Sequence, residues 1–198
     1  ITSVTDSQNK VTAYAYDAKG NLLSVTDPTG AITQYQYDSK GNVISITNAN
    51  NQTTTLAYDQ FNNLASVTDP TGSTTTFAYD VAGNMTSQTD SHGNTTRFEY
   101  NSLNQLIKIT DPQNNITTYT YDKNGNRTSE TDANGKTTYY EYNYKGQLTK
   151  VTDSLGNVTT YTYGGTGCSS CGGGTDKLTA ITDAKGNTTT YQYDTTGR

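Results

Sequence analysis

A tyrosine recurs every 21 residues along most of this 198-residue chain. The recurring residues are Tyr16, Tyr37, Tyr58, Tyr79, Tyr100, Tyr121, Tyr142 and Tyr163, and the next equivalent, Tyr193, follows after 30 residues. A column of Asp or Asn residues keeps the same spacing from Asp6 to Asp153 and also steps by 30, to Asp183. The sequence therefore predicts a single array of nine repeats over residues 1–198, with one nine-residue insertion.

Each repeat contains two short segments and two turn signals. Residues 21–27 and 31–37 are rich in Thr, Tyr and Val and are too short for stable helices. Residues 27–30, Asp-Pro-Thr-Gly, have the preferences of a type I turn, and residues 38–41 repeat the Asp-x-x-Gly pattern. We therefore predict an all-β fold of antiparallel β-hairpin repeats, with about 18 strands, two for each repeat. Because twisted open sheets rarely exceed about ten strands without curling or closing, we expect a long coiled ribbon, a spiral or a hollow shell.

The composition argues against a conventional hydrophobic core. Leu, Ile, Val and Phe together number 28 of 198 residues, whereas Thr numbers 41 and Tyr 17. So low an apolar fraction can indicate disorder, but the abundance of Thr and Tyr favours strands. A net charge of −5 with 13 scattered Lys and Arg residues argues against nucleic-acid binding. No segment approaches the roughly 20 apolar residues of a membrane-spanning helix.

Other side-chain columns recur at the same period. The column of Tyr35 has the same parity as the recurring tyrosines, and we expect the tyrosines to form a contiguous ladder along the sheet. In the other segment, the column of Leu22 is apolar except at Arg127, and a second apolar column begins at Val25 with the opposite parity. Which columns share a face depends on the hairpin register, and turn length alone does not settle the register.

The Gly-rich insertion, residues 164–177, contains both cysteines, Cys168 and Cys171. We expect it to leave the sheet as an exposed loop. A CxxC spacing is compatible with a local disulfide, with free thiols, or with a metal or cross-chain bridge, and we favour the disulfide. A structural zinc site needs four ligands, and the chain offers no second Cys pair. The single histidine, His92, lies five repeats away and is expected to be a solvated turn residue.

The sequence predicts no catalytic, cofactor-binding or metal-binding residues. The recurring Asp and Asn residues could suggest calcium ligands, but Asp also caps turns by bonding its own backbone. The turns lack the alternating acidic spacing of calcium loops. An enzyme site needs unlike titratable groups that converge in a pocket, whereas the repeat multiplies each group along the chain. These features favour a scaffold, or a surface that binds glycans or a partner protein through adaptable Tyr, Ser, Gly and Asn contacts.

The sequence resembles the YD-repeat family, also called the RHS-repeat family. The resemblance rests on Tyr-Asp-x-x-Gly-Asn at residues 16–21, 37–42, 79–84 and 121–126, followed by Leu-x-x-Val-Thr-Asp patterns. It extends over the whole chain and is weaker at residues 58–63 and 142–147. The family includes Rhs polymorphic toxins, wall-associated proteins, toxin-complex subunits and teneurins. The resemblance implies a β-ribbon that spirals into a hollow shell, which in the toxins encloses a C-terminal payload.

The resemblance also implies a function for the segment. The implied role is a structural shell or scaffold segment of a secreted or surface-exposed bacterial protein, with a toxin-like payload outside this segment. Rhs-type toxins end their shell with a self-cleaving motif that often contains Asp-Pro. The Asp-Pro pairs of this chain, which begin at Asp27, Asp69 and Asp111, are turn residues at the repeat period, so self-cleavage is not implied.

The alternative is a self-assembling extracellular fibre subunit or an adhesive surface. A repeat protein normally needs atypical capping repeats, and neither end of this sequence carries one. The expected partners are therefore the remainder of a longer YD-repeat chain, or identical subunits that stack end to end.

Overall fold

The computed structural model of this chain describes residues 2–164 and 176–194. Cys168 and Cys171 lie outside these described residues, so the predicted disulfide stays a prediction. Within the described ranges there is no helix of the length and apolar character needed to cross a membrane.

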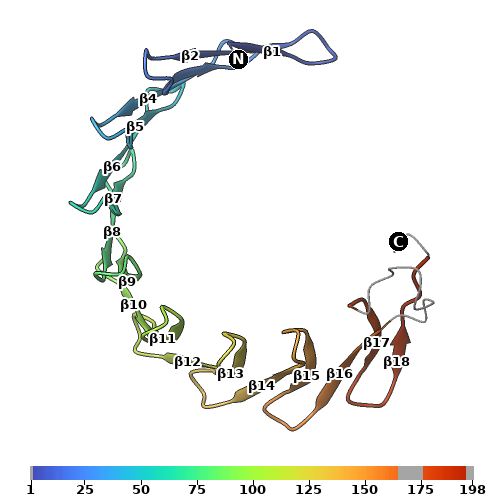
Figure 1. Ribbon diagram of the computed structural model, residues 1–198. Coiled ribbons are helices and arrows are strands. Elements are labelled where there is room, and N and C mark those ends of the chain that lie inside the picture. Colours follow the sequence, from blue (N-terminus) through green and yellow to red (C-terminus); the bar gives the residue numbers. More distant parts are fainter. Residues whose placement is uncertain (1, 165–175, 195–198) are drawn as a thin grey trace. The chain divides into compact units, whose positions relative to one another are not determined.

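The regular elements of the described residues are all β-strands, which confirms the predicted all-β fold (Figure 1). Thr, Tyr, Val and Ile fill them because these residues pack well on a pleated, half-buried surface. In chain order the strands are β1 (Ser3–Thr5), β2 (Val11–Tyr16), β3 (Leu22–Thr26), β4 (Ile32–Tyr37), β5 (Val43–Thr47), β6 (Thr53–Tyr58), β7 (Leu64–Thr68), β8 (Thr74–Tyr79), β9 (Met85–Thr89), β10 (Thr95–Tyr100), β11 (Leu106–Thr110), β12 (Ile116–Tyr121), β13 (Arg127–Thr131), β14 (Thr137–Tyr142), β15 (Leu148–Thr152), β16 (Val158–Tyr163), β17 (Leu178–Thr182) and β18 (Thr188–Thr190).

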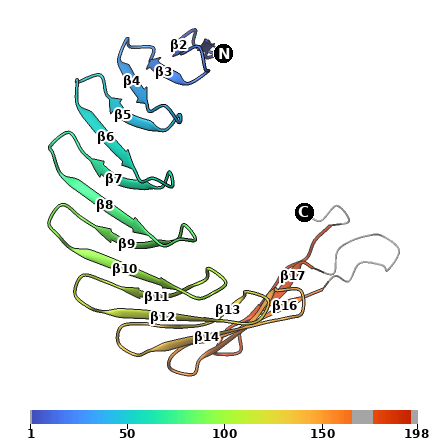
Figure 2. The same ribbon diagram turned by 60° about the vertical axis from the view of Figure 1, so that its left-hand side comes forward.

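The chain divides into two units, residues 1–97 and 98–198, and the boundary falls within β10. In the first unit each strand from β1 to β9 pairs antiparallel with the strand that follows it, as the succession of β4 to β9 shows in Figure 2. In the second unit β11 to β18 pair in the same consecutive way. The predicted antiparallel hairpin repeats are therefore confirmed in each unit.

Two kinds of five-residue turn alternate along the chain. The TD turns, such as residues 27–31, follow the five-residue strands, and the YD turns, such as residues 38–42, follow the six-residue strands. In the YD turn, the N–H of Asp38 donates to the carbonyl of Asn42 over 2.9 Å, and the N–H of Gly41 donates to the carbonyl of Asp38 over 3.2 Å. Gly41 has a φ of 93°, a left-handed conformation that glycine adopts without steric cost. Because strand direction alternates, all TD turns of a unit lie at one edge of its sheet and all YD turns lie at the other.

Each YD hairpin with a described register contains a β-bulge next to its turn. In the β4–β5 hairpin, Gln36 opposes Ser45 but Tyr37 opposes Val43, so Ile44 is an extra residue on β5. The same shift occurs in the pairs β2–β3, β6–β7, β8–β9, β12–β13, β14–β15 and β16–β17. A bulge of this kind inverts the alternation of side chains on the strand that carries it.

The bulge places both apolar columns on the same face as the tyrosines. Tyr37 opposes Val43 and Tyr35 opposes Ile46, and directly opposed residues of an antiparallel pair share a face. We call this side the aromatic face, and it consists of the recurring Tyr column, the Tyr35 column and the two apolar columns. The other side, which we call the polar face, is represented in β4 and β5 by Gln34, Gln36, Ser45 and Thr47.

The described residues form no buried hydrophobic core. No hydrophobic side chain among them is buried, and Ser129, at 8% exposure, is the one buried polar residue. The aromatic-face columns are mostly half-buried against their neighbours in the sheet. Each unit is therefore held by its backbone ladder, its turns and lateral side-chain contacts.

Candidate functional site: the aromatic face

Four of the recurring tyrosines use their hydroxyl groups to link successive repeats. The Tyr37 hydroxyl donates to the Leu22 carbonyl over 2.9 Å, and Tyr58 donates to Val43 over 3.0 Å. Tyr121 donates to Leu106 over 2.7 Å, and Tyr193 to Leu178 over 2.8 Å. In each case the acceptor lies 15 residues earlier, at the start of the previous five-residue strand.

The strand register explains why these carbonyls are available. The described pairing of β3 with β4 ends at Ser24 opposite Gln34, so the Leu22 carbonyl lies beyond the ladder. Leu22 itself opposes Tyr16, the ladder tyrosine of the previous repeat. The Tyr37 hydroxyl therefore gives the Leu22 carbonyl a hydrogen-bond donor that the pairing of β3 with β4 does not supply.

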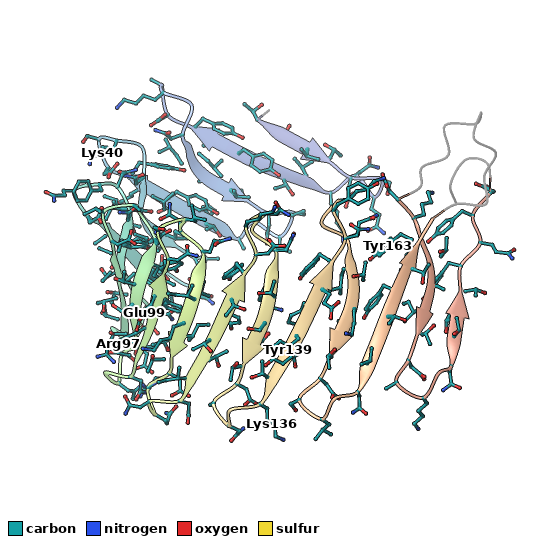
Figure 3. The ribbon with its side chains drawn as sticks, turned by 60° about the horizontal axis from the view of Figure 1, so that its bottom comes forward. Lys40, Arg97, Glu99, Lys136, Tyr139 and Tyr163 are labelled. Carbon is teal, nitrogen blue, oxygen red and sulfur yellow. The ribbon has the colours of Figure 1, made fainter. Side chains whose placement is uncertain are left out.

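The predicted ladder tyrosines from Tyr16 to Tyr163 each end a strand, on its aromatic face. Tyr193 lies just after the end of β18. Tyr16 and Tyr193 are 43% and 42% exposed, and the ladder tyrosines between them in the sequence are half-buried. Tyr79 opposes Met85, and Tyr163 opposes Leu178 across the strands that flank the insertion. In the second unit, Tyr163 and Lys136 lie at opposite edges of the sheet (Figure 3).

One strand departs from the apolar pattern of this face. In β13, Arg127 opposes Tyr121, and Glu130 opposes Tyr119, at positions that hold apolar residues in most other repeats. Arg127 pairs with Glu130 at 3.1 Å, and its guanidinium carbon lies 5.5 Å from the Tyr119 ring centre and 4.9 Å from that of Tyr140. Burial and then the Glu130 charge raise the pKa of the Tyr119 hydroxyl above its ordinary value of 10.0. The sequence showed Arg127 as an interruption, but not its stacking between two tyrosines.

The turns, which border the face, are capped by their first residue. The Asp38 carboxylate accepts the backbone N–H groups of Lys40 and Asn42, each over 2.9 Å, and the Asn42 side-chain amide, also over 2.9 Å. The Asn42 bonds are the main cause that lowers the pKa of Asp38 below its ordinary value of 3.8. In this geometry, hydrogen bonds within the turn engage the carboxylate oxygens.

A second turn pattern, which joins the first and fifth turn residues, was not recognised from the sequence. Where the first turn residue is Asn in place of Asp, the fifth residue is Gln, and the Asn side-chain amide donates to the Gln side-chain oxygen. These pairs are Asn48–Gln52, Asn101–Gln105 and Asn143–Gln147, at 2.8 to 2.9 Å. The longer Gln side chain brings an acceptor to the Asn donor, so the two positions vary together. This covariation was visible in the sequence.

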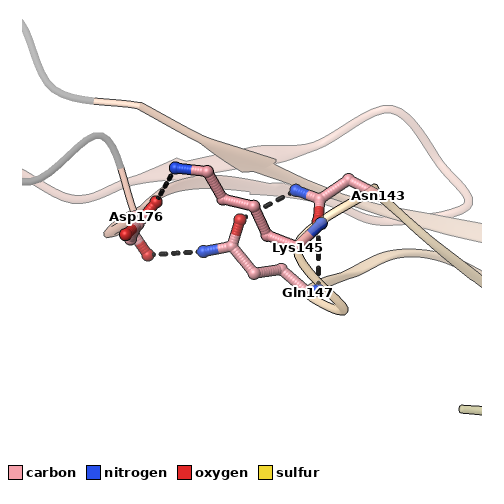
Figure 4. A network of polar contacts seen from close by, with 4 residues as sticks. All are labelled: Asn143, Lys145, Gln147 and Asp176. Carbon is pink, nitrogen blue, oxygen red and sulfur yellow. Dashed lines mark hydrogen bonds and ion pairs between the residues drawn. The ribbon is translucent and has the colours of Figure 1, made fainter. Parts of the chain in front are cut away.

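The insertion begins and ends like a normal turn. The Gly164 N–H donates to the Lys177 carbonyl over 3.0 Å, which is the bond between the first and fifth residues of other turns. Asp176 forms an ion pair with Lys145, and its carbonyl accepts the Gln147 side-chain amide over 2.8 Å (Figure 4). The flanking strands β16 and β17 keep the register and bulge of the other repeats.

His92 occupies the third position of the TD turn at residues 90–94. Its backbone N–H donates to the Asp90 carboxylate over 2.9 Å, and its ring lies 3.4 Å from the Ser91 hydroxyl. Among the described residues, no group of three or more His, Cys, Asp or Glu side chains is arranged to hold a metal ion.

Comparison with known protein families shows which family the chain belongs to. A family model described as the Teneurin YD-shell matches residues 1–137 and 60–166, which together span more than half of the chain. The chain belongs to the YD-shell family. The RHS Repeat model matches residues 174–198. The predicted YD-repeat, or RHS-repeat, membership is thereby confirmed.

Solved structures share the fold of this chain. The structure of TcdB2-TccC3-TEV superposes with a TM-score of 0.64 at 16% identity, and covers 99% of this chain and 13% of that one. TcdB2-TccC3-Cdc42 gives 0.62 at 16% identity, with 98% and 13% covered. This YD-shell chain thus spans a small fraction of the length of those proteins. A search of curated protein sequences found no match.

Proposed function

We propose that this chain is a wall segment of a secreted or surface-exposed bacterial YD-repeat shell. In this proposal the aromatic face is turned toward an enclosed, toxin-like polypeptide that lies outside the segment. The observation that carries the proposal is the half-exposed aromatic face, which no hydrophobic core covers within the described residues.

A face of this kind needs a partner layer. A sheet that is apolar on one side is normally stabilised by burying that side against another element. Here the apolar columns and the tyrosines of a unit lie together on one side, because the bulge brings them there. Extended apolar surface usually marks a contact site for polypeptide. YD-shell membership supports a wall as the role of the segment.

The proposal assigns no catalysis to this segment. Its turn aspartates cap turns and recur at the repeat period, so they do not converge on one point. The proposed partners are the remainder of a longer YD-repeat chain and the enclosed polypeptide, and the proposed location is extracellular or on the cell surface. The proposed wall role requires no cofactor.

The test is a photo-crosslinking comparison between the two faces, in the full-length protein that contains this segment. Phe77, on the aromatic face, and Thr76, its neighbour on the polar face, are each replaced by benzoylphenylalanine. We expect position 77 to crosslink to peptides outside the repeat array, and position 76 to give few such products. Equal yields from both positions, or products from position 76 alone, would contradict the proposal.

A further inference from the structure

One charged pair interrupts the apolar columns of the aromatic face in the second unit. Arg127 and Glu130 of β13 hold the positions that belong to the Leu22 and Val25 columns. The other members of these columns in the unit are all aliphatic, namely Leu106, Ile109, Leu148, Val151, Leu178 and Ile181. Because charged side chains cost free energy when they are removed from water, this pair is unexpected on a face that packs against apolar side chains alone.

Contacts within the face hold the Arg127 side chain in place. Its Nη1 atom lies 3.1 Å from Oε2 of Glu130. Its guanidinium carbon lies 5.5 Å from the ring centre of Tyr119 and 4.9 Å from that of Tyr140, on the strands to either side. Each ring attracts the cation through its negatively polarised face. The guanidinium is therefore fixed above the aromatic face, between the two rings.

This site offers more hydrogen-bond donors than acceptors. A guanidinium group has five N–H donors and no acceptor. Glu130 is the ionic partner of Arg127, and no other acceptor for its guanidinium is present among the residues that the structure describes. The hydroxyls of Tyr119 and Tyr140 likewise have no hydrogen-bond partner in that part of the chain. Because the side chains of Arg127 and Glu130 are 40% and 36% exposed, water can reach the unused donors while the face is uncovered.

A polypeptide that covers this face would remove that water. A charged donor that is buried without an acceptor is strongly destabilising, so the covering chain has to bring an acceptor to Arg127. A carboxylate suits the site best, because its two oxygens accept two parallel N–H bonds from the planar guanidinium. The Tyr119 and Tyr140 hydroxyls are additional donors for the same anion.

We propose that Arg127 binds an Asp or Glu side chain of the enclosed polypeptide. This inference rests on the proposed wall function, and it names the chemistry of one contact between the wall and its content. The Nε and Nη2 atoms of Arg127 bind the incoming carboxylate, while Nη1 keeps its contact with Glu130. The aliphatic columns on either side favour apolar residues next to the acidic one. A basic side chain is disfavoured, because it would add donors to a site that already has an excess of them.

The first test identifies the residue that faces Arg127, in the full-length protein that contains this segment. Tyr140, which contacts Arg127, is replaced by benzoylphenylalanine, which is photo-reactive and keeps an aromatic ring. Tyr161, at the equivalent position one repeat later and opposite Ile181, receives the same replacement as the matched control. We expect position 140 to crosslink to a peptide outside the repeat array, with an Asp or Glu directly beside the crosslinked residue or close to it in sequence. Products of position 161 should show no such preference.

The second test removes the charged pair. The double variant Arg127→Leu/Glu130→Val restores the residue types that the next repeat has at these positions, so the fold should be retained. We expect the crosslinking yield from position 140 to fall at least fivefold in this variant, and the yield from position 161 to be unchanged. Replacement of the identified acidic residue by Ala should cause a similar fall. Because both changes remove the same contact, their combination should lower the yield no further.

The outcomes separate this inference from the wall function. If both positions crosslink outside the array but the yield from position 140 is unchanged in the double variant, with an unchanged circular dichroism spectrum, the inference is wrong and the wall function stands. Products of position 140 without a nearby acidic side chain, including a crosslink beside the chain-terminal carboxylate alone, would also overturn it. If neither position crosslinks outside the array, the wall function fails, and this inference fails with it.

Discussion

The recurring Tyr column and the Tyr35 column lie on the same face, yet they differ in how strictly they keep tyrosine. The recurring column is Tyr in every repeat, whereas the Tyr35 column also contains Leu56, Phe77 and Phe98. The structure offers a reason for four members of the first column, whose hydroxyls bond to carbonyls of the previous repeat. The Tyr35 hydroxyl has no partner among the described residues.

Removal of a ladder hydroxyl that bonds to a carbonyl should therefore lower the stability of the fold. Removal of the Tyr35 hydroxyl should not. Tyr58→Phe leaves the Val43 carbonyl without its partner, and we expect a loss of about 0.5–1.5 kcal/mol in unfolding free energy. Tyr35→Phe should change stability little, since Phe77 already occupies the equivalent position. Urea denaturation of both variants tests this. Equal losses would show that the hydroxyl bond contributes nothing specific.

At Gly83, the fourth residue of a YD turn, backbone conformation and not space favours glycine. Gly83 has a φ of 85°, and a Cβ added there would meet no atom within 4 Å. Gly83→Val should cost roughly 1–2 kcal/mol, because a β-branched residue is strained in this conformation. Gly83→Asn should be close to neutral, since Asn62 and Asn104 hold the same position with φ of 75° and 58°. Thermal unfolding of the two variants measures the difference, and similar melting temperatures would refute the explanation.

At the scale of the elements, the capped turns make stability depend on pH. The pKa values of eleven turn aspartates are lowered from 3.8, chiefly by hydrogen bonds from the residues two and four positions later. A lowered folded-state pKa means that the unfolded chain binds protons first as the pH falls. The stabilisation is therefore fully present above the unfolded value and is lost as the pH falls through the folded values. We expect a constant melting temperature from pH 7 to about pH 5 and a steep fall below about pH 4.

A double variant isolates the contribution of one turn. Asp38→Asn with Asn42→Gln recreates the pairing of Asn48 with Gln52, which has no titrating group. This variant should fold and should lose less stability between pH 5 and pH 3 than the unmodified protein. A pH profile identical to that of the unmodified protein would show that Asp38 does not contribute.

The strands and turns could be predicted from the sequence, but the faces could not. Turn residues such as Asp27 to Gly30 and the Tyr spacing mark each element, because turn conformation and strand propensity are local properties. The bulge at Ile44 depends on how two strands pair. It places the Val43 and Ile46 columns on the same face, although their spacing in the sequence suggested opposite faces.

At the scale of the whole molecule, the uncovered aromatic face should dominate solution behaviour. We expect the isolated 198-residue segment to self-associate as its concentration rises, and to bind an apolar dye. The reason is that its apolar columns are half-exposed to water. Val67→Lys, on the aromatic face, should weaken association more than Thr76→Lys on the polar face. Light scattering coupled to size exclusion measures the mass. A monomer at all concentrations would contradict the expectation.

The hydroxyl bonds from ladder tyrosines to the previous repeat have a mechanical consequence. In the first unit, the bond of Tyr58 to Val43 and that of Tyr37 to Leu22 act in series in two successive repeats. Over these repeats, a chain pulled from one end would peel in equal steps, each releasing 21 residues, or roughly 70 Å of extended chain. Such a ribbon yields to traction repeat by repeat, at nearly constant force, and does not rupture all at once.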